Sequence, residues 1–369
     1  MIPTVLLEMK IKDVFEIFRR LRNDNVKELR KKFEPYFAEF TSSGSAAIVA
    51  ALKALGVEKG NEVILPAYMC EKCAKFLIEN GYKLKFVEID SETYNIDLSD
   101  LKKKISSKTK TIIATHMHGN LCNISKIREV SGKIPIIEDS AQSFDFNKPL
   151  GEFKVFSLGL GKPITGCGGG VLLTENKKLA DNASKIIANF GKPMNNLKVF
   201  TNLISLCLVN FKLIYNLSYK YKIQQNKKLK QKYKKYSGES LPEFSNFQAA
   251  ITLNQLSKIS KYNELRKRNQ EFLKEKLRNK KIISINNGSV LLRFPIQVKN
   301  VLDIENKLRK GGIVASKLYP DSLPVYFGKG NLCPIAQKVA NETVCLPIHP
   351  MVKENEIQKI VTYVRRLAI

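Results

Sequence analysis

Short apolar runs alternate with helical patterns along residues 41–175. Four of the runs have the length and composition of buried strands: 61–67 (NEVILPA), 82–90 (YKLKFVEID), 110–117 (KTIIATHM) and 133–140 (KIPIIEDS). Between them, 45–56 and 70–81 have the apolar spacing of helices. This alternation predicts an α/β domain with a mostly parallel sheet, in which ligands bind at the carboxyl ends of the strands.

The last third of the chain has a different pattern. Residues 247–277 predict a long connecting helix, and 289–298 (SVLLRFPIQV) predict a later strand. We therefore expect two domains. Residues 1–240 form a large α/β domain, and residues 241–369 form a smaller α+β domain that includes the connecting helix.

Residues 191–240 interrupt the large domain as a helical, basic insertion. An apolar stretch, 197–223, contains Asn202, Asn210 and Lys212, which disfavour a helix that crosses a bilayer. The basic tract QQNKKLKQKYKKYSG follows it. One interpretation is a helical hairpin that covers the active-site edge or a subunit interface. The other is a weak contact of residues 198–235 with an anionic membrane surface.

The charge of the chain is unusual for its size. In 369 residues, 62 Lys and Arg oppose 34 Asp and Glu, which gives a net charge of +28. Such an excess is typical of proteins that bind nucleic acid or anionic membranes, but also of lysine-rich solvated surfaces. No nucleic-acid-binding signature is present, so no nucleic acid partner is expected.

Cysteine usage and the N-terminus indicate a cytoplasmic protein. Seven cysteines are scattered without framework spacing, which is typical of reduced thiols. Cys70 and Cys73 form a CxxC pair, but no second pair exists to complete a zinc site, so no metal is expected. Glu8 and Lys10 interrupt the first apolar stretch, which predicts neither a signal peptide nor a membrane span.

The segment SSGSAAIVAALKALG (42–56) predicts a phosphate site. Ser43 or Ser45 can cap the helix, and Gly56 can end it. A helix N-terminus offers free N–H groups and the positive end of the dipole. Many capped helices bind nothing, so this signal is weak by itself.

Two carboxylates end the run IPIIEDSAQ (134–142). Glu138 and Asp139 point to opposite faces if the strand continues, so at most one of them faces a ligand. A buried carboxylate there needs a cation or a donor. The alternative is an Asp that caps the following helix.

Lys162 lies in FSLGLGKPITGCGGG (156–170). The segment is not a P-loop, because Phe156 stands at the first glycine position and Pro163 replaces the Ser or Thr. It is not GxGxxG either, since Ile164 stands at the last glycine position. A lysine confined on a tight glycine-rich loop loses hydration, so its pKa falls and its amine can form Schiff bases with aldehydes.

These three segments together suit pyridoxal 5'-phosphate. The cofactor requires a helix N-terminus for its phosphate, a carboxylate for its pyridinium nitrogen and a lysine for its aldehyde.

The motifs also resemble those of the DegT/StrS family of sugar aminotransferases, which have the fold type I architecture. The resemblance runs from about residue 36 to the C-terminus, apart from 191–240. Its motifs here are Gly44-Ser45, GNEVILP (60–66), FVEIDSETYNID (86–97), THMHGN (115–120), Glu138-Asp139 with Ala141-Gln142, the Lys162 segment, and LCPIAQKVANETVCLPIHP (332–350).

The resemblance implies roles for individual residues. Lys162 would hold the cofactor and move protons, Asp139 would bind the ring nitrogen, and Gln142 would bind the ring hydroxyl. The phosphate contacts would be Gly44, Ser45 and Ser157.

Three positions depart from the family pattern. Cys70 stands at the place of an aromatic residue that stacks on the ring, and Tyr68 is the expected substitute. Leu241-Pro242-Glu243 replaces an Asn-x-Arg that contacts phosphate across the dimer, and 318–330 lacks a usual histidine. His349 is expected to be structural.

The implied function is transfer of an amino group from an amino acid, with glutamate the expected donor, to a keto-sugar nucleotide in aminosugar and surface polysaccharide biosynthesis. The enzyme would be a homodimer. One alternative is a sugar dehydratase of the same fold, although such relatives generally lack the lysine. Another is a non-catalytic regulatory or scaffold protein.

Overall fold

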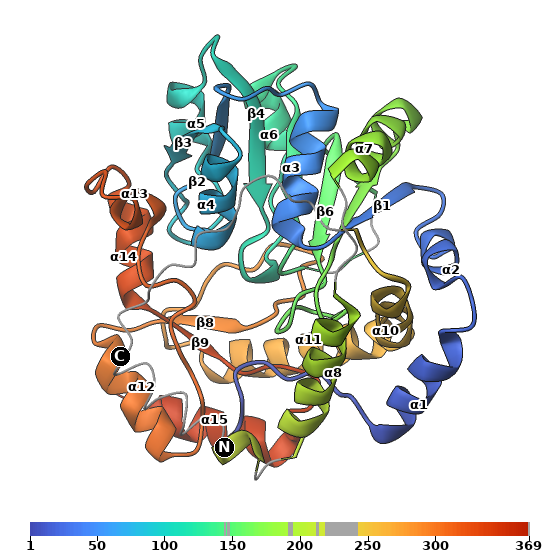
Figure 1. Ribbon diagram of the computed structural model, residues 1–369. Coiled ribbons are helices and arrows are strands. Elements are labelled where there is room, and N and C mark those ends of the chain that lie inside the picture. Colours follow the sequence, from blue (N-terminus) through green and yellow to red (C-terminus); the bar gives the residue numbers. More distant parts are fainter. Residues whose placement is uncertain (144, 146–147, 191–194, 212–213, 218–242, 368–369) are drawn as a thin grey trace.

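The computed structural model describes residues 1–143, 145, 148–190, 195–211, 214–217 and 243–367 (Figure 1). A seven-stranded sheet occupies one half of the molecule. In spatial order its strands are β1 (Phe37–Thr41), β7 (Gly170–Thr174), β6 (Phe153–Ser157), β5 (Ile136–Asp139), β4 (Thr109–Thr115), β2 (Glu62–Pro66) and β3 (Lys83–Val87). Only β7 runs antiparallel to its neighbours, so the predicted mostly parallel sheet and its four predicted strands are confirmed.

Helices cover both faces of this sheet because its central strands β2, β4 and β5 bury apolar residues on both faces. Val63 and Leu65 of β2 pack in the same core as α3 (Gly44–Ala54), α4 (Glu71–Glu79) and α7 (Lys177–Phe190). Ile64, between them in sequence, packs in a second core with α5 (Leu98–Lys104) and α6 (Ile124–Ser131). Successive side chains thus alternate between the two layers.

The start and end of α3 follow from its sequence. The Ser43 Oγ accepts a hydrogen bond from the Ala46 N–H at 3.1 Å, which caps the helix. Gly56 has φ +74°, and the Val57 N–H beyond it donates to the Leu52 oxygen at 2.9 Å. Glycine adopts this left-handed conformation without steric cost, so it ends the helix as expected.

The C-terminal part contains a second, smaller sheet of β8 (Phe294–Gln297) and β9 (Thr343–Leu346), which are antiparallel. Its helices are α12 (Val301–Lys310), α13 (Leu323–Tyr326), α14 (Pro334–Glu342) and α15 (Glu354–Arg366). The first residues of the chain also lie here, since Ile2 forms a β-bridge with Ile313. The domain boundary at 240/241 falls within residues that are not described, and it stays a prediction.

The expectation of one long connecting helix at 247–277 is wrong. The structure has two helices, α10 (Asn246–Leu256) and α11 (Ile259–Lys276). At the break, the Ser257 hydroxyl donates to the Asn254 oxygen at 2.8 Å. Such local side-chain hydrogen bonds compete with the helical ladder, and the chain turns before α11 begins.

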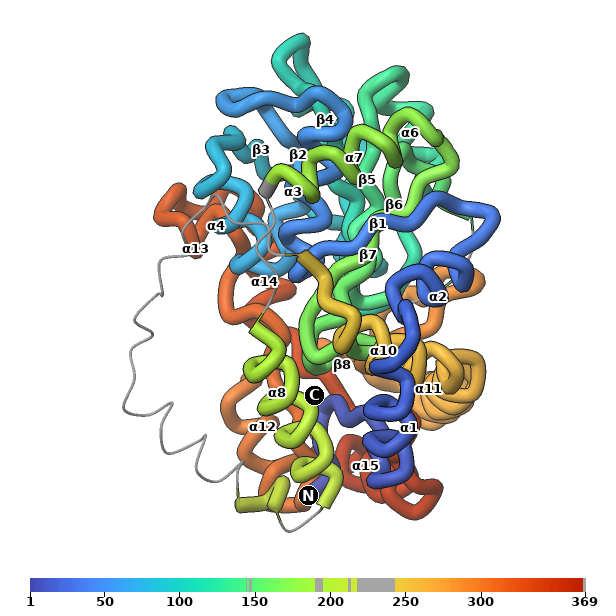
Figure 2. The backbone as a smooth tube through the Cα atoms, turned by 45° about the vertical axis from the view of Figure 1, so that its right-hand side comes forward, coloured from blue at the N-terminus to red at the C-terminus, as the bar shows by residue number. Residues whose placement is uncertain are grey.

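Three helices lie at the edge of the molecule: α1 (Ile11–Arg20), α2 (Asn25–Lys31) and α8 (Asn196–Val209). In Figure 2, α8 lies at the surface of the molecule, near α10 and the N-terminus. Its Val199, Leu203 and Leu206 are buried in a core that includes Phe247 and Ile251 of α10. In the described part of the chain, no helix has the length and apolarity that a bilayer span requires.

Candidate active site

Lys162 lies on the tight loop that connects β6 to β7. The loop closes on itself, because the Leu158 N–H donates to the Gly169 oxygen at 2.8 Å and the Gly166 N–H donates to the Leu158 oxygen at 2.9 Å. Arg266 of α11 holds the residue after Lys162, donating from Nη2 to the Pro163 oxygen at 2.7 Å. The lysine is partly buried and is held on a rigid backbone.

The surroundings of Lys162 make its amine more nucleophilic. Burial lowers its pKa below the ordinary value of 10.5. Cys70 and Asp139 act in the opposite direction, while the positive charge of Arg293 lowers the pKa further. A larger fraction of the amine is therefore neutral near pH 7 than in an exposed lysine.

Asp139 ends β5 and is 5% exposed. It accepts hydrogen bonds from the Ala141 N–H at 3.1 Å and, more weakly, from the Thr115 hydroxyl at 3.4 Å. Burial raises the pKa of this carboxyl, and the charge of Lys162 opposes that shift without cancelling it. The carboxylate is thus short of a cationic partner.

Glu138 points to the other face, as the strand geometry predicts. Its Oε1 accepts from the Leu150 and Gly151 N–H groups at 2.6 and 2.8 Å, and His116 Nε2 lies 3.2 Å from Oε2. Burial acts to raise its pKa, but the hydrogen bond from His116 and the charge of Lys154 outweigh burial and lower it. Glu138 therefore links elements and stays ionised.

The hydrogen bonds of His116 define its tautomer. The Cys122 N–H donates to Nδ1 at 2.9 Å, so Nε2 carries the proton that it donates to Glu138.

The start of α3 lies close to the ends of β6 and β7. A Cβ added to Gly44 would be 2.9 Å from the Ser157 Cβ, and one added to Gly170 would be 2.4 Å from the Ser43 oxygen. Ser45 is in the first turn of α3 and is partly buried. The structure therefore brings Gly44, Ser45 and Ser157 together at a helix N-terminus.

Gln142 follows Asp139 in the loop after β5 and is buried. Its Nε2 lies 3.2 Å from the Tyr319 hydroxyl and 3.4 Å from the Met117 sulfur. Its Oε1 is buried and has no hydrogen-bond partner among the described residues. This oxygen can therefore accept a hydrogen bond from a ligand that binds beside Asp139.

Tyr68 lies in a cluster of aromatic rings. The ring centroids of Tyr319, Tyr94 and His118 lie 5.3, 6.1 and 6.3 Å from its own. Cys70 is the N-cap residue of α4, and burial raises the pKa of its thiol. The role of Tyr68 as the stacking residue stays a prediction.

Sequence reasoning missed Arg293 and Tyr319. Arg293 precedes β8 and donates from Nη2 to the Gly161 oxygen at 3.4 Å. Tyr319 contacts Gln142, and Asp139 contributes to raising its pKa after burial and Cys70. Arg293 belongs to no motif, and only the tyrosine–proline sequence at 319–320 pointed to Tyr319.

His349 is buried and joins two segments of backbone. Nε2 lies 3.0 Å from the Pro3 oxygen, and Nδ1 accepts from the Met351 N–H at 3.2 Å. Burial lowers its pKa to about 3, so the ring is neutral. These contacts agree with a structural role.

A model of the DegT/DnrJ/EryC1/StrS aminotransferase family matches residues 22–365. The chain belongs to this family. The predicted family is thereby confirmed.

Curated relatives include the GDP-perosamine synthase of Escherichia coli O157:H7, which is 34% identical over 167 residues. That match covers 41% of this chain and 46% of the relative, so the chain spans about half the length of that protein. UDP-2-acetamido-2-deoxy-3-oxo-D-glucuronate aminotransferase of Pseudomonas aeruginosa is 26% identical over 334 residues, 86% of this chain and 83% of the relative.

Among solved structures, E. coli GDP-4-keto-6-deoxy-D-mannose-3-dehydratase with bound hydrated PLP aligns with a TM-score of 0.79. The alignment covers 98% of this chain and 99% of that one at 19% identity. This likeness confirms the predicted fold type I architecture of the family member.

Of the three departures from the family pattern, Leu241 and Pro242 lie outside the described residues. Glu243 is exposed. Segment 318–330 includes α13 and carries Tyr319 into the site.

Proposed function

We propose that this family member is a pyridoxal-phosphate-dependent aminotransferase that moves an amino group from an amino acid, glutamate above all, to a keto-sugar nucleotide in aminosugar and surface polysaccharide biosynthesis. The observation that carries the proposal is that Lys162, on the β6–β7 loop, and Asp139, at the end of β5, act on each other's charge. The pKa of the partly buried lysine is lowered, and the pKa of the buried carboxyl is raised.

The residues present fit this cofactor. The Asp139 carboxyl is short of a cation, and a protonated ring nitrogen is one. The unpartnered Oε1 of Gln142 can accept a hydrogen bond from the ring hydroxyl, or the amide can turn and donate to it. The α3 N-terminus, with Gly44, Ser45 and Ser157, suits its phosphate.

The chain's own groups divide the work. When bound, pyridoxal phosphate supplies an aldehyde for the donor's amine and a ring that stabilises negative charge on the reacting carbon. Lys162 Nζ holds the cofactor, then takes and returns the proton at that carbon. Asp139 keeps the ring nitrogen protonated, and Gln142 fixes the ring orientation.

The test combines spectroscopy with product analysis. The purified protein, reconstituted with the cofactor, should show the visible absorption band of the lysine-bound form, and Lys162→Ala should lose it. Lys258→Ala, which changes a lysine at the α10–α11 junction, should keep it. Mass spectrometry of a panel of keto-sugar nucleotides incubated with glutamate should show an aminated product.

Other outcomes contradict the proposal in distinguishable ways. Loss of water without gain of an amine would favour the dehydratase alternative, to which some relatives belong. Absence of the absorption band after reconstitution would favour a scaffold protein. Lys162 argues against both alternatives, because neither requires a nucleophilic amine at this place.

We further propose that the enzyme is a cytoplasmic homodimer with two domains, divided near residue 240. The family resemblance supports this, and so does the small β8–β9 sheet beside the large one. Light scattering at several protein concentrations checks the mass, and a monomer at all concentrations would refute the dimer.

The membrane contact predicted for residues 198–235 falls largely on 212–213 and 218–235, which lie outside the described residues. From the part that is described, we propose a membrane-surface contact for an apolar patch that α8 forms together with α1. Its residues are Ile11, Phe15, Phe18, Leu197, Phe200, Ile204 and Leu208, and all of them are exposed. The patch is continuous, because the Phe18 and Phe200 rings contact each other at 6.1 Å. Exposed Lys12, Arg19, Arg22 and Lys198 lie on the same helices or next to them.

Charge decides which partner we assign to the patch. The net charge of +28, with Lys12, Arg19, Arg22 and Lys198 exposed beside the patch, attracts anionic lipid. Co-sedimentation with phosphatidylserine vesicles should exceed that with phosphatidylcholine vesicles, and Phe15→Glu with Phe200→Glu should abolish it. Leu302→Glu, on exposed α12, should leave it unchanged. Self-association through the patch without vesicle binding would refute the assignment.

A further inference from the structure

Arg293 contacts the backbone of Gly161, the residue that precedes Lys162. It precedes β8 in the C-terminal part, yet its guanidinium approaches the Lys162 loop. Its hydrogen bond to the Gly161 oxygen, 3.4 Å long, exceeds the usual range of about 2.7–3.2 Å and is weak. Arginine carries five N–H donors, so most of this group's capacity is left for another acceptor.

No carboxylate compensates this charge within the described residues. The groups that interact with Arg293 electrostatically are Cys345, Tyr319 and Tyr68, all of which are neutral at pH 7. Burial lowers the pKa of Arg293, and its positive charge in turn lowers the pKa of Lys162. Arg293 is partly buried, and a guanidinium that is partly shielded from water without a compensating anion costs free energy, which the binding of an anion relieves.

Arg266, which is buried, has the contacts expected of an arginine with a structural role. Arg266 is 1% exposed and donates to the Pro163 oxygen at 2.7 Å and to Asn263 Oδ1 at 3.1 Å. It also stacks near the ring of Tyr262, 5.9 Å away. Arg266 therefore holds backbone with short hydrogen bonds, whereas Arg293 makes one long hydrogen bond.

We infer that the Arg293 guanidinium binds a carboxylate of the reacting substrate beside Lys162. The inference rests on the proposed function and deepens it. In an amino-acid donor, the carboxylate is attached to the same carbon as the amine that reacts. An anion site near Lys162 is therefore where the donor's α-carboxylate must lie when its amine reacts. A planar guanidinium can bind that carboxylate through two parallel hydrogen bonds.

Two substrates carry a carboxylate that Arg293 can bind. One is the amino-acid donor, through its α-carboxylate, and the other is a sugar that is a uronic acid. Both bring a carboxylate to the reacting centre. Probes that cannot react separate them. Glutarate carries carboxylates without an amine, and UDP-glucuronate carries a sugar carboxylate without a reactive ketone.

The experiment measures binding of each probe to the cofactor-loaded enzyme by calorimetry. Arg293→Gln should weaken binding of at least one probe about 10- to 100-fold, the range for a hydrogen-bonded charge. Arg293→Lys should restore part of it. Arg309→Gln, which changes a partly buried arginine on α12, should leave binding unchanged.

Each outcome has a defined meaning. Weakening of glutarate alone assigns the donor, weakening of UDP-glucuronate alone assigns the sugar, and unchanged binding of both overturns the inference. The visible absorption band of the lysine-bound cofactor should persist in Arg293→Gln, which shows that the site is intact. Absence of that band in the unaltered enzyme would instead refute the proposed function, whatever the effect of Arg293.

Discussion

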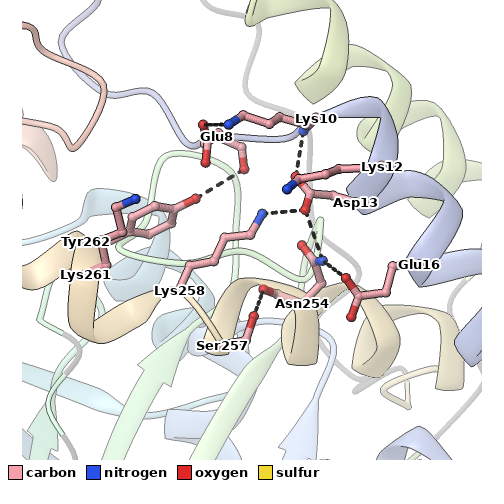
Figure 3. A pocket seen from close by; sticks show the side chains of 10 residues that line it. All are labelled: Glu8, Lys10, Lys12, Asp13, Glu16, Asn254, Ser257, Lys258, Lys261 and Tyr262. Carbon is pink, nitrogen blue, oxygen red and sulfur yellow. Dashed lines mark hydrogen bonds and ion pairs between the residues drawn. The ribbon is translucent and has the colours of Figure 1, made fainter.

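Two regions of this molecule place a lysine beside a buried aspartate, and the two pairs differ in how completely they are satisfied. One is Lys258 with Asp13, in a 430 Å³ pocket between α1 and the α10–α11 junction (Figure 3). Asp13 there has an ion pair to Lys258 Nζ at 2.8 Å and accepts hydrogen bonds from the Lys10 N–H at 2.7 Å and from Asn254 at 3.4 Å. The other is Lys162 with Asp139.

The contrast appears in the pKa values of the two carboxyl groups. Burial acts to raise the pKa of Asp13, but the hydrogen bonds from Lys258 and Lys10 outweigh it and lower the pKa. At Asp139 burial prevails, and the pKa is raised. A satisfied pair stabilises the fold by itself, whereas an unsatisfied pair is stabilised when a ligand completes it. Residue types alone do not separate a structural pair from a functional one.

The largest expected effect is on catalysis. Asp139→Asn should reduce kcat about 10²- to 10³-fold, because an amide no longer keeps the ring nitrogen protonated, and one lost electrostatic contact in an active site has this magnitude. Asp13→Asn should leave kcat within about twofold. Steady-state kinetics with glutamate checks both, and equal losses in the two variants would erase the distinction between the regions.

The peripheral pair should matter for stability instead. Lys258→Met leaves Asp13, which is 3% exposed, without its cation, and should lower the free energy of unfolding by about 1–3 kcal/mol. Urea denaturation measures the loss. A double variant, Lys258→Met with Asp13→Asn, should recover part of it, since the unpaired charge is gone. If the double variant is no more stable than Lys258→Met, the ion pair is not the cause.

Backbone crowding also distinguishes the active site. Gly44→Ala places a Cβ 2.9 Å from the Ser157 Cβ, so the α3 start or the end of β6 must shift. We expect a loss of about 1–2 kcal/mol in stability and weaker cofactor binding. Gly151→Ala is the matched control, because its Cβ would lie 2.5 Å from the Ile136 oxygen and so crowds the backbone without touching Ser157 or Lys162. Cofactor titration should be altered in the first variant and unchanged in the second.

Much of the fold was accessible from the sequence because strand and helix patterns there agree with tertiary packing. β2 to β5 contribute residues to the cores on both faces of the sheet. A buried strand is therefore the structure that fits each of these apolar runs. Periodicity did not show the break between α10 and α11, since apolar spacing continues across Ser257 and Lys258. A local side-chain hydrogen bond decided that position.

The candidate site was predictable only where residues adjoin in motifs. Asp139, Gln142 and Lys162 lie within one stretch of chain, and strand geometry separated Glu138 from Asp139. Arg293 reaches the site from the C-terminal part, across more than 100 residues of sequence. No spacing rule links it to Lys162, so only the three-dimensional contact with Gly161 revealed it.

The smallest expected effect, in the cofactor-free protein, is a pH dependence of opposite sign for the two aspartates. The folded pKa of Asp13 lies below the ordinary 3.8, so the unfolded chain binds more protons between the two values. Its contribution to stability is therefore present above pH 3.8 and is lost as pH falls through the folded pKa. The folded pKa of Asp139 lies above 3.8, so the folded protein binds the extra proton and stability falls as pH rises through that window.

The slope for one group cannot exceed about 1.4 kcal/mol per pH unit, and variants isolate each contribution. Without cofactor, Asp139→Asn should be more stable than the unaltered protein at pH 7, and this advantage should shrink toward pH 4. Asp13→Asn should be less stable at pH 7, with a deficit that shrinks only below pH 4. Thermal melts from about pH 2 to about pH 8 measure both. Added cofactor should cancel the advantage of Asp139→Asn, because the ring nitrogen then supplies the missing cation, and an advantage that persists would show that Asp139 faces no such partner.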